Sequence, residues 1–446
     1  MKKSRWGLIA GTATALLLAG PVLAQTPLRK AINADYGQHL QSLYTHFHEN
    51  PELSFEEKAT AKRLAAELKE AGYAVTTGVG RTGIVAVMHN GKGPTLMIRT
   101  DMDALPVKER TGLPYASTAT GQNYLGDKGL PIMHACGHDI HMTSLVGVAR
   151  RMAALKDQWS GTLVLIGQPA EEVGLGAKAM IDDGLFTRFP KPDFNLAFHD
   201  SANLPAGMIG YTPGYALANV DSVDIEVRGV GGHGAYPQTT KDPVIVGAYI
   251  VTALQTLVSR EIDPQKPAVV TVGAFNAGTK HNIISDHAHL KLTVRSYSDK
   301  VRKKLLDGIR RIAKNQARAF GVPENLLPVV TMEKNYTPST YNDPALVKRV
   351  IGAITKEVGA DHVMKTPPVM GGEDFAQYGR TADKIPGFLF WAGAVNPQVY
   401  ADAKAKGKTL PSLHSPFFAP DPERTITTAV EAMSAAALEL LGKGNG

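Results

Sequence analysis

The stretch from Met133 to His141 reads Met-His-Ala-Cys-Gly-His-Asp-Ile-His and contains the only cysteine of the chain. Thiolate and imidazole together are ligands that a borderline-soft ion such as Zn²⁺ prefers. Cys136 and His138 are two residues apart, so in an extended segment their side chains point to the same side. From Asp139 the pattern is helical, with Asp139 as a plausible cap. We expect a chelating turn that leads into a helix; the alternative is a buried, inert cysteine near surface histidines.

The segments that must position this turn are short β-rich runs that alternate with helical patterns. They lie at 83–88, 95–99, 163–167 and 195–198. This alternation predicts an α/β catalytic domain with a parallel or mixed sheet. Polar residues follow three of the runs directly: Asp101 and Asp103, then Glu171-Glu172, then His199. Ligands in such folds bind outside the carboxyl ends of strands, so these side chains should converge on one site.

The adjacent pair Glu171-Glu172 has a chemical logic. Two neighbouring carboxylates take different roles when their environments differ. One can bind a metal ion while the other, unbound, accepts the proton of a metal-held water. Alternatively, the pair marks the start of a helix, where the helix dipole stabilises a glutamate. For Asp101 and Asp103, the sequence supports a structural role in a turn or as a helix cap as well as it supports a functional role.

The pattern changes near residue 216. Strand, helix, two strands and a basic amphipathic helix follow, with a last strand near 329–332. This order resembles the split βαβ motif of ferredoxin-like domains. We therefore predict an inserted α+β domain at 216–332. The α/β pattern then resumes, so 25–215 and 333–446 form one discontinuous domain, as a chain of 446 residues allows.

Residues 1–24 have the pattern of a secretory signal. Lys2, Lys3 and Arg5 form a basic head, Leu8 to Ala19 form an apolar stretch, and a small-residue cleavage signal follows. A membrane anchor is the alternative, but the apolar run is short and carries polar residues. We predict an exported protein, periplasmic or secreted, with no membrane attachment after signal cleavage.

The charge balance argues against one class of partner. The formal net charge is +7, and three of the basic residues lie in the signal. No basic run interleaved with aromatic residues is present, so nucleic acid is not an expected partner. A single cysteine cannot form an internal disulfide. A lone thiol kept in an oxidising compartment fits a metal-bound thiolate.

Six motifs in fixed order carry a family resemblance. They are Arg-Thr-Asp-Met-Asp-Ala-Leu-Pro, Met-His-Ala-Cys-Gly-His-Asp, Pro-Ala-Glu-Glu, Gly-Gly-His-Gly-Ala, Gly-Gly-Glu-Asp-Phe and Leu-His-Ser-Pro-Phe. The set resembles the dinuclear metal amidohydrolases, in particular the hippurate hydrolase and auxin-conjugate hydrolase branch, which is related to carboxypeptidase G and aminoacylase. The match spans nearly all of the chain after residue 24, and the cysteine motif is its most specific part.

The resemblance implies roles for individual residues. The ligands of two divalent metal ions would be Cys136, His138, Glu172, His199 and His414. Glu171 would be the general base, and Asp103 would support the ligands from behind. His233, on an inserted lid and dimerisation domain, would reach the site of a partner subunit. Asn282 and Arg295 would help to hold the substrate carboxylate or the reaction oxyanion.

The activity implied is metal-dependent hydrolysis of N-acyl-L-amino acids, such as hippurate-like, auxin-conjugate-like or ochratoxin-like aromatic amides. Zn²⁺ is favoured by the thiolate, and Mn²⁺, Co²⁺ or Ni²⁺ would fit the same donors. A homodimer or larger homo-oligomer is expected. The alternatives are a metallocarboxypeptidase or dipeptidase and, from another class, a periplasmic binding protein that lost catalysis. A serine hydrolase is disfavoured, because no Gly-x-Ser-x-Gly elbow is present.

Four departures from the family pattern leave the substrate open. Residues 121–131 lengthen the loop before the cysteine motif. Asp200-Ser201 follows His199, where the family usually has an apolar residue. Gln238 stands where a second histidine is common, and His281 stands where a small residue or proline is common.

Overall fold

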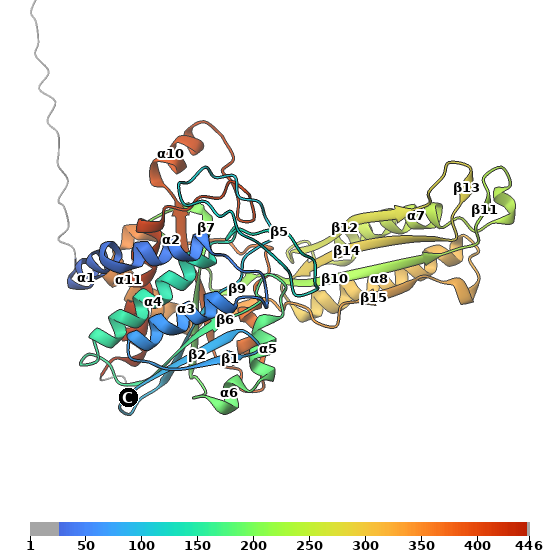
Figure 1. Ribbon diagram of the computed structural model, residues 1–446. Helices are drawn as coiled ribbons and strands as arrows, with labels where there is room; N and C mark the ends of the chain where they lie inside the picture. The colour runs from blue at the N-terminus through green and yellow to red at the C-terminus, as the bar shows by residue number, and fades with distance from the viewer. Residues whose placement is uncertain (1–25, 444–446) are drawn as a thin grey trace, which may run out of the picture.

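An eight-stranded mixed sheet forms the centre of the larger lobe in the computed structural model, which describes residues 26–443 (Figure 1). The predicted signal, 1–24, lies outside the described residues. The strand order is β1-β2-β6-β3-β7-β18-β8-β17. Four parallel neighbours form its middle: β6 (Gly161–Gln168), β3 (Thr95–Asp101), β7 (Phe194–Pro205) and β18 (Gly387–Val395). The predicted α/β arrangement with a mixed sheet is therefore present.

Helices cover both faces of this sheet, which explains why its central strands are apolar on both sides. Leu96 and Ile98 of β3 pack in one core cluster, and Met97 between them packs in another. The first cluster lies under α1 (Pro27–Asp35), α2 (Gln41–Glu49), α3 (Lys58–Glu70), α4 (His138–Ala154), α9 (Pro344–Val358) and α11 (Pro422–Leu441). The second lies under α5 (Gly176–Asp182), α6 (Leu185–Arg188) and the 3₁₀ segment Asp374–Arg380.

The outer strands of the sheet are β1 (Ala74–Val79), β2 (Gly83–Asn90), β8 (Ile209–Tyr211) and β17 (Val363–Lys365). The connections carry β4 (Thr120–Gly121), β5 (Leu130–Pro131) and α10 (Pro397–Ala405). A π-helical turn, Tyr36–Leu40, joins the first two helices.

The segment after Ser54 is not helical until α3 begins at Lys58. The preceding turn is held out of helical geometry by Glu57, whose carboxylate accepts hydrogen bonds from the backbone N–H groups of Phe55 and Ala170 at 2.9 and 2.8 Å. Phe55 has a positive φ of 63°. A tertiary contact, invisible to local propensity, thus delays the helix by one turn.

Residues 219–332 form an elongated projection, which we call the arm (Figure 1). It contains β10 (Asn219–Arg228), α7 (Pro243–Thr256), β12 (Ala268–Ala277), β14 (His287–Ser296), α8 (Asp299–Ala319) and β15 (Val329–Met332). The four strands pair antiparallel in the order β12-β14-β10-β15. Alternate residues of β10 are buried, because both helices pack on one face of this sheet.

The arm has a small strand pair at its far end and one long apolar helix. At its far end, β11 (Gly232–His233) pairs with β13 (Ile283–Ile284). Among the described helices, α7 with its π-helical continuation, Pro243–Glu261, is apolar and long enough to cross a membrane by length and composition alone. In the structure α7 packs against the arm's own sheet and against α8.

The arm joins the larger lobe through β9 (Gly214–Leu217), which pairs with β16 (Thr340–Asn342). Arm strands begin at Asn219, three residues beyond the predicted boundary at 216. Tyr215 stacks on Tyr297 with ring centroids 5.8 Å apart. Arg380 of the larger lobe forms an ion pair with Asp299 at the start of α8.

Candidate metal centre

The predicted chelating turn leads into α4, but its cap differs from the expectation. The helix begins at His138 and its N-cap is Gly137, with φ of 77°. Asp139, predicted as the cap, lies inside the first turn, where its carboxylate binds His48 Nδ1 at 2.6 Å. A Cβ on Gly137 would lie 2.6 Å from the Asp200 carboxylate. Glycine is thus required both by the left-handed backbone and by this close approach.

Cys136 and His138 are both buried at this helix start. His138 donates from Nδ1 to the backbone carbonyl of Asp103 at 2.7 Å, which fixes its tautomer and turns Nε2 toward Cys136. Within residues 26–443 this Nε2 is buried and has no hydrogen-bond partner. An imidazole held in this way is oriented as metal ligands are.

Glu171 and Glu172 follow β6 in a loop held by two acidic side chains from elsewhere. The two oxygens of the Asp103 carboxylate accept hydrogen bonds from the backbone N–H groups of Glu171 and Glu172, at 3.1 and 3.0 Å. Ser54 Oγ donates to the same carboxylate at 2.6 Å. Asp103 therefore acts on the site by positioning this loop, and Glu57 supports it through Ala170, whose φ is 51°.

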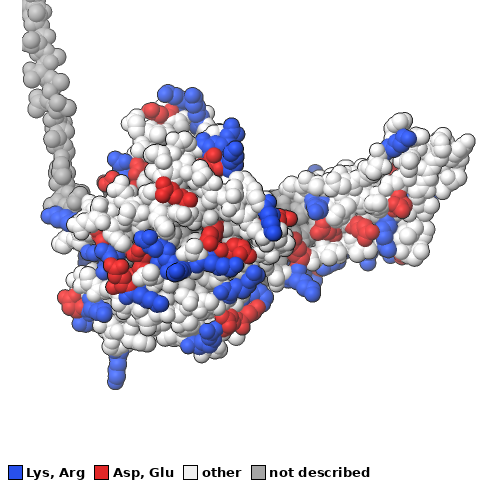
Figure 2. All heavy atoms as spheres, in the orientation of Figure 1, with Lys and Arg blue, Asp and Glu red and all other residues white. Residues whose placement is uncertain are grey.

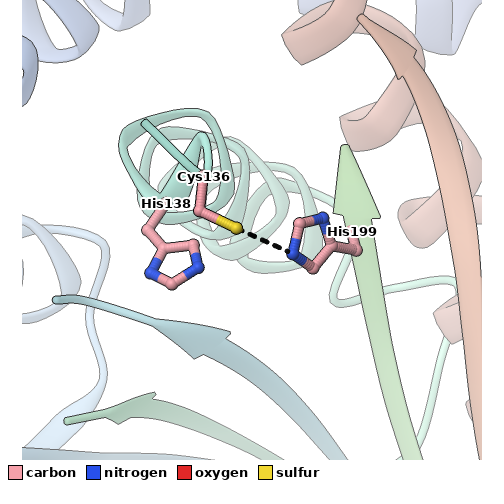
Figure 3. Close-up of side chains that lie close together, drawn as sticks. All are labelled: Cys136, His138 and His199. Carbon is pink, nitrogen blue, oxygen red and sulfur yellow. Dashed lines mark hydrogen bonds between the residues drawn. The ribbon is translucent and has the colours of Figure 1, made fainter. Parts of the chain in front are cut away.

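The remaining two histidines approach Cys136 from other elements. His199, near the middle of β7, lies with Nε2 at 3.6 Å from Cys136 Sγ, as Figure 3 shows. Its Nδ1 donates to the backbone carbonyl of Asp200 at 2.8 Å. His414, on a loop with φ of 67°, lies with Nε2 at 3.2 Å from the same sulfur and 3.5 Å from Glu172 Oε2.

The structure thus brings all five predicted ligands into one cluster. Their candidate ligand atoms form overlapping groups within 4.8 Å, and Cys136 belongs to one with His138 and His199 and to another with Glu172 and His414. Cys136 would therefore supply its thiolate to both groups. Within the described residues Glu172 Oε1, like His138 Nε2, is buried without a hydrogen-bond partner. With Nδ1 of His138 donating, His138 Nε2 and Glu172 Oε1 both present lone pairs, and the two atoms lie 3.9 Å apart, which fits a bound cation.

The electrostatics of the cluster also call for positive charge. Burial and Glu172 raise the pKa of the Cys136 thiol well above its usual value. Burial, Glu373 and Glu172 raise the pKa of Glu171 in the same way. For Glu172, burial raises the pKa to about 8. These acidic groups are crowded without a cation, and a divalent ion would favour their charged forms.

A buried arginine that the sequence did not single out, Arg99, ties the ends of β3 and β6 to the start of the 3₁₀ segment Asp374–Arg380. Arg99 donates to Asp101 at 2.6 Å, to Glu373 at 2.8 Å and to Gln168 at 3.0 Å. Asp101 in turn contacts His141 Nδ1 at 2.6 Å. Both Arg99 and His141 lie inside motifs used above, so a signal existed, but only the fold shows their partners.

The predicted substrate residues lie elsewhere in this structure. His233 and Asn282 belong to the far end of the arm, where the N–H of Gly234 donates to the Asn282 carbonyl at 2.9 Å. Arg295 lies at the junction of arm and lobe and donates to the Met370 carbonyl at 2.8 Å. The structure therefore assembles the predicted ligands within one chain and places His233 and Asn282 at the far end of the arm, away from them.

Comparison with known proteins places this geometry in a family. The model of the peptidase family M20/M25/M40 matches residues 97–438. Hippurate hydrolase of Campylobacter jejuni is 41% identical over 336 residues, which cover 74% of this chain and 82% of that protein. Thermostable carboxypeptidase 2 of Saccharolobus solfataricus is 36% identical over 374 residues, which cover 83% of this chain and 88% of that protein.

A solved structure agrees with this assignment. The crystal structure of a Bacillus subtilis protein, described as a dinuclear metal binding peptidase of the M20 family, matches with a TM-score of 0.72 and 29% identity, covering 92% of this chain and 99% of that one. The predicted resemblance is confirmed. This chain belongs to the peptidase family M20/M25/M40, and it is a hydrolytic enzyme that acts on amide bonds.

Proposed function

We propose that the enzyme hydrolyses the amide bond of N-acyl-L-amino acids that carry an aromatic or apolar acyl group. The observation that carries this proposal is a partly buried glutamate, Glu171, whose carboxylate lies within 4.8 Å of the candidate ligand atoms of His138 and Glu172. The similarity to hippurate hydrolase supports an acyl amino acid as substrate. A free base beside a metal centre is the arrangement that hydrolysis with an activated water needs.

The cofactors proposed are two divalent ions held by Cys136, His138, Glu172, His199 and His414. When bound, such a pair polarises the scissile carbonyl and acidifies a water molecule. The thiolate favours Zn²⁺, whereas Mn²⁺, Co²⁺ and Ni²⁺ suit the imidazole and carboxylate donors. The unpartnered atoms of His138 and Glu172 are the support for this assignment.

Glu171 is proposed to accept the proton of the attacking water and to return it to the leaving amine nitrogen. Its backbone N–H is anchored on Asp103 at 3.1 Å, so the side chain starts from a fixed point. His233 is proposed to donate a hydrogen bond to the oxyanion, and Asn282 and Arg295 to hold the substrate carboxylate.

A homodimer, or a larger homo-oligomer, is proposed to bring the arm of one subunit to the site of another. His233 and Asn282 sit at the end of the arm farthest from their own chain's larger lobe (Figure 1). The arm also exposes apolar side chains, including Ile245 and Tyr249 of α7 and Phe275 of β12, which is an edge strand. On the face in Figure 2, the outer end of the arm carries few charged residues.

Export to the periplasm or the exterior is proposed from the pattern of residues 1–24. Small N-acyl amino acids would then be the partners, with neither membrane nor nucleic acid. Charges of both signs are interspersed on the face of the larger lobe that Figure 2 shows, which agrees with the absence of a basic stripe in the sequence.

Carboxypeptidase or dipeptidase action is the second candidate, favoured by the similarity to thermostable carboxypeptidase 2. Amine release from a panel of N-acyl amino acids and short peptides, with and without a chelator, separates the two. Chelator-sensitive cleavage of N-benzoyl and other aromatic acyl amino acids is the expected result. Cleavage of peptides without cleavage of acyl amino acids would contradict this proposal and support peptidase action. Turnover of acyl amino acids that survives complete metal removal would contradict the metal mechanism.

A further inference from the structure

Asp200 carries a carboxylate that has no role in the reaction proposed above. It follows His199 on β7 and is fully buried. Its Oδ1 lies 3.2 Å from His199 Nδ1 and 3.1 Å from His141 Nε2. Within residues 26–443 its Oδ2 is buried with no hydrogen-bond partner. A buried carboxylate with one unpartnered oxygen is costly, so its presence needs a compensating charge.

The surroundings hold Asp200 in place from two sides. On one side its carboxylate lies against Gly137, between the predicted ligands Cys136 and His138, at a distance that leaves no room for a Cβ. On the other side, its backbone N–H points to His141 Nε2 at 2.9 Å, and His141 is held in turn by Asp101 at 2.6 Å. The carboxylate is thus fixed directly behind the ligand turn.

The Asp200 carboxylate can compensate positive charge that the proposed ligands leave on the metal ions. Two divalent ions carry four positive charges, whereas the proposed ligands supply one thiolate, one carboxylate and three neutral imidazoles. A further negative charge just behind the ligands stabilises the loaded site in a medium of low dielectric constant. Residues behind metal ligands also orient them, and their loss typically lowers metal affinity by about 10- to 100-fold.

We propose that Asp200 is a positioning residue that orients His199 and raises the affinity of the site for divalent cations. It does so by two contacts with one imidazole: its backbone carbonyl accepts from His199 Nδ1 at 2.8 Å, and Oδ1 lies 3.2 Å from the same nitrogen. The anionic oxygen strengthens the donor character of Nε2, which faces Cys136 at 3.6 Å. This inference rests on the proposed metal centre.

The test is the metal affinity of Asp200→Asn, which keeps the shape of the side chain and removes its charge. Metal-free protein is titrated with Zn²⁺ or Mn²⁺ in competition with a chromophoric chelator. The expected dissociation constant is about 10- to 100-fold weaker than that of the wild type. The thermal midpoint of the metal-free variant should stay near that of the wild type, while the midpoint increase on metal loading shrinks.

Asp182→Asn is the matched control, because the Asp182 side chain is exposed on α5, pairs with Lys178 and carries the same charge. It should bind metal as the wild type does. Asp200→Ala gives a second determination if the asparagine variant is insoluble. Unchanged affinity in the Asp200 variants, beside a wild type that binds two ions, would overturn this inference alone. A wild type that binds no divalent ion would overturn the metal centre as well.

Discussion

The ligand cluster of the larger lobe and the far end of the arm carry the two halves of the predicted site, and they are held very differently. Cys136, His138 and His199 are buried, and each histidine has its second nitrogen tied to a backbone carbonyl. His233 is exposed on a two-residue strand, and its Nδ1 accepts a hydrogen bond from the nearby N–H of Ala235 at 3.0 Å.

The difference shows which half of the chemistry is preorganised. A cluster braced from behind keeps its geometry without substrate, which favours metal binding and electrostatic catalysis. An exposed histidine on a short strand gains a defined position only when another surface meets it. Variants in the lobe should therefore act within one chain, whereas variants at the end of the arm should depend on how subunits combine.

The largest effect is expected from Glu171→Gln in the larger lobe. Loss of the general base should lower kcat by about 10³-fold or more, while metal content stays at the wild-type level. Turnover of an N-acyl amino acid and metal analysis on the same sample measure both. Glu172→Gln serves as the contrast, because it should lose metal together with activity. Substantial activity in Glu171→Gln would remove Glu171 from its role.

His233→Ala tests the other half of the comparison. Loss of an oxyanion donor should lower kcat by about 10²-fold with metals retained. When His233→Ala and Glu171→Gln subunits are mixed, part of the activity should return, since one active site then combines an intact Glu171 with an intact His233. Neither parent variant should regain activity after the same mixing procedure alone. If no activity returned, His233 would have to act within its own chain.

Asp103→Asn should have an intermediate effect, because it weakens the anchor of the Glu171-Glu172 loop without removing a reacting group. We expect kcat to fall by about tenfold to a hundredfold, with a smaller change in KM. Ser54→Ala, which removes one hydrogen bond to the same carboxylate, should show a smaller loss. Equal losses of turnover in the two variants would show that charge at Asp103 does not matter.

The smallest effect on activity is expected at His48, which braces Asp139 at 2.6 Å and Glu109 at 3.2 Å. Burial lowers the pKa of His48, but these carboxylates outweigh it and raise the pKa to about 10. A raised folded-state pKa means that the stabilisation is complete below the unfolded pKa of about 6.5 and is lost as pH rises toward 10.

His48→Gln should therefore lower the free energy of unfolding by about 3 kcal/mol at pH 6, with the difference from wild type shrinking toward pH 10. Urea unfolding of the metal-free proteins across this range measures it. A deficit that does not change with pH would mean that His48 contributes by packing, against Tyr44 and Tyr115, instead of by charge.

Much of the fold followed from apolar periodicity, because the central strands and long helices repeat a clear pattern. The expected runs at 95–99, 163–167 and 195–198 lie within β3, β6 and β7. The three-residue strands β8 and β17 were missed, since so short a segment carries no period. Glu57 was missed because its importance lies in a contact with Ala170, 113 residues away.

The candidate site also contains both residues that the sequence predicted and residues that only the structure reveals. Four of the five ligand positions stand in the motifs that carry the family resemblance, and His199 was expected just after a strand. The structure places His199 near the middle of β7, because this strand continues to Pro205. The supporting residues Arg99 and His141 were not found, since their partners Gln168, Glu373 and Asp101 lie 69, 274 and 40 residues away and no local pattern names them. Asp200 gave a visible signal, a charged residue where an apolar one is usual, but only its burial beside Gly137 shows what that charge does.

The spacing of the ligands along the chain has a consequence for biosynthesis. Cys136 and His414 meet across 278 residues, with the whole arm between them. During synthesis four of the five donors emerge long before the last one, and contacts so distant in sequence form slowly. A chain that stops before residue 414 therefore lacks the ligand that completes the cluster. Because metal binding adds its free energy to folding, only a chain that includes residue 414 gains the full stabilisation from bound metal.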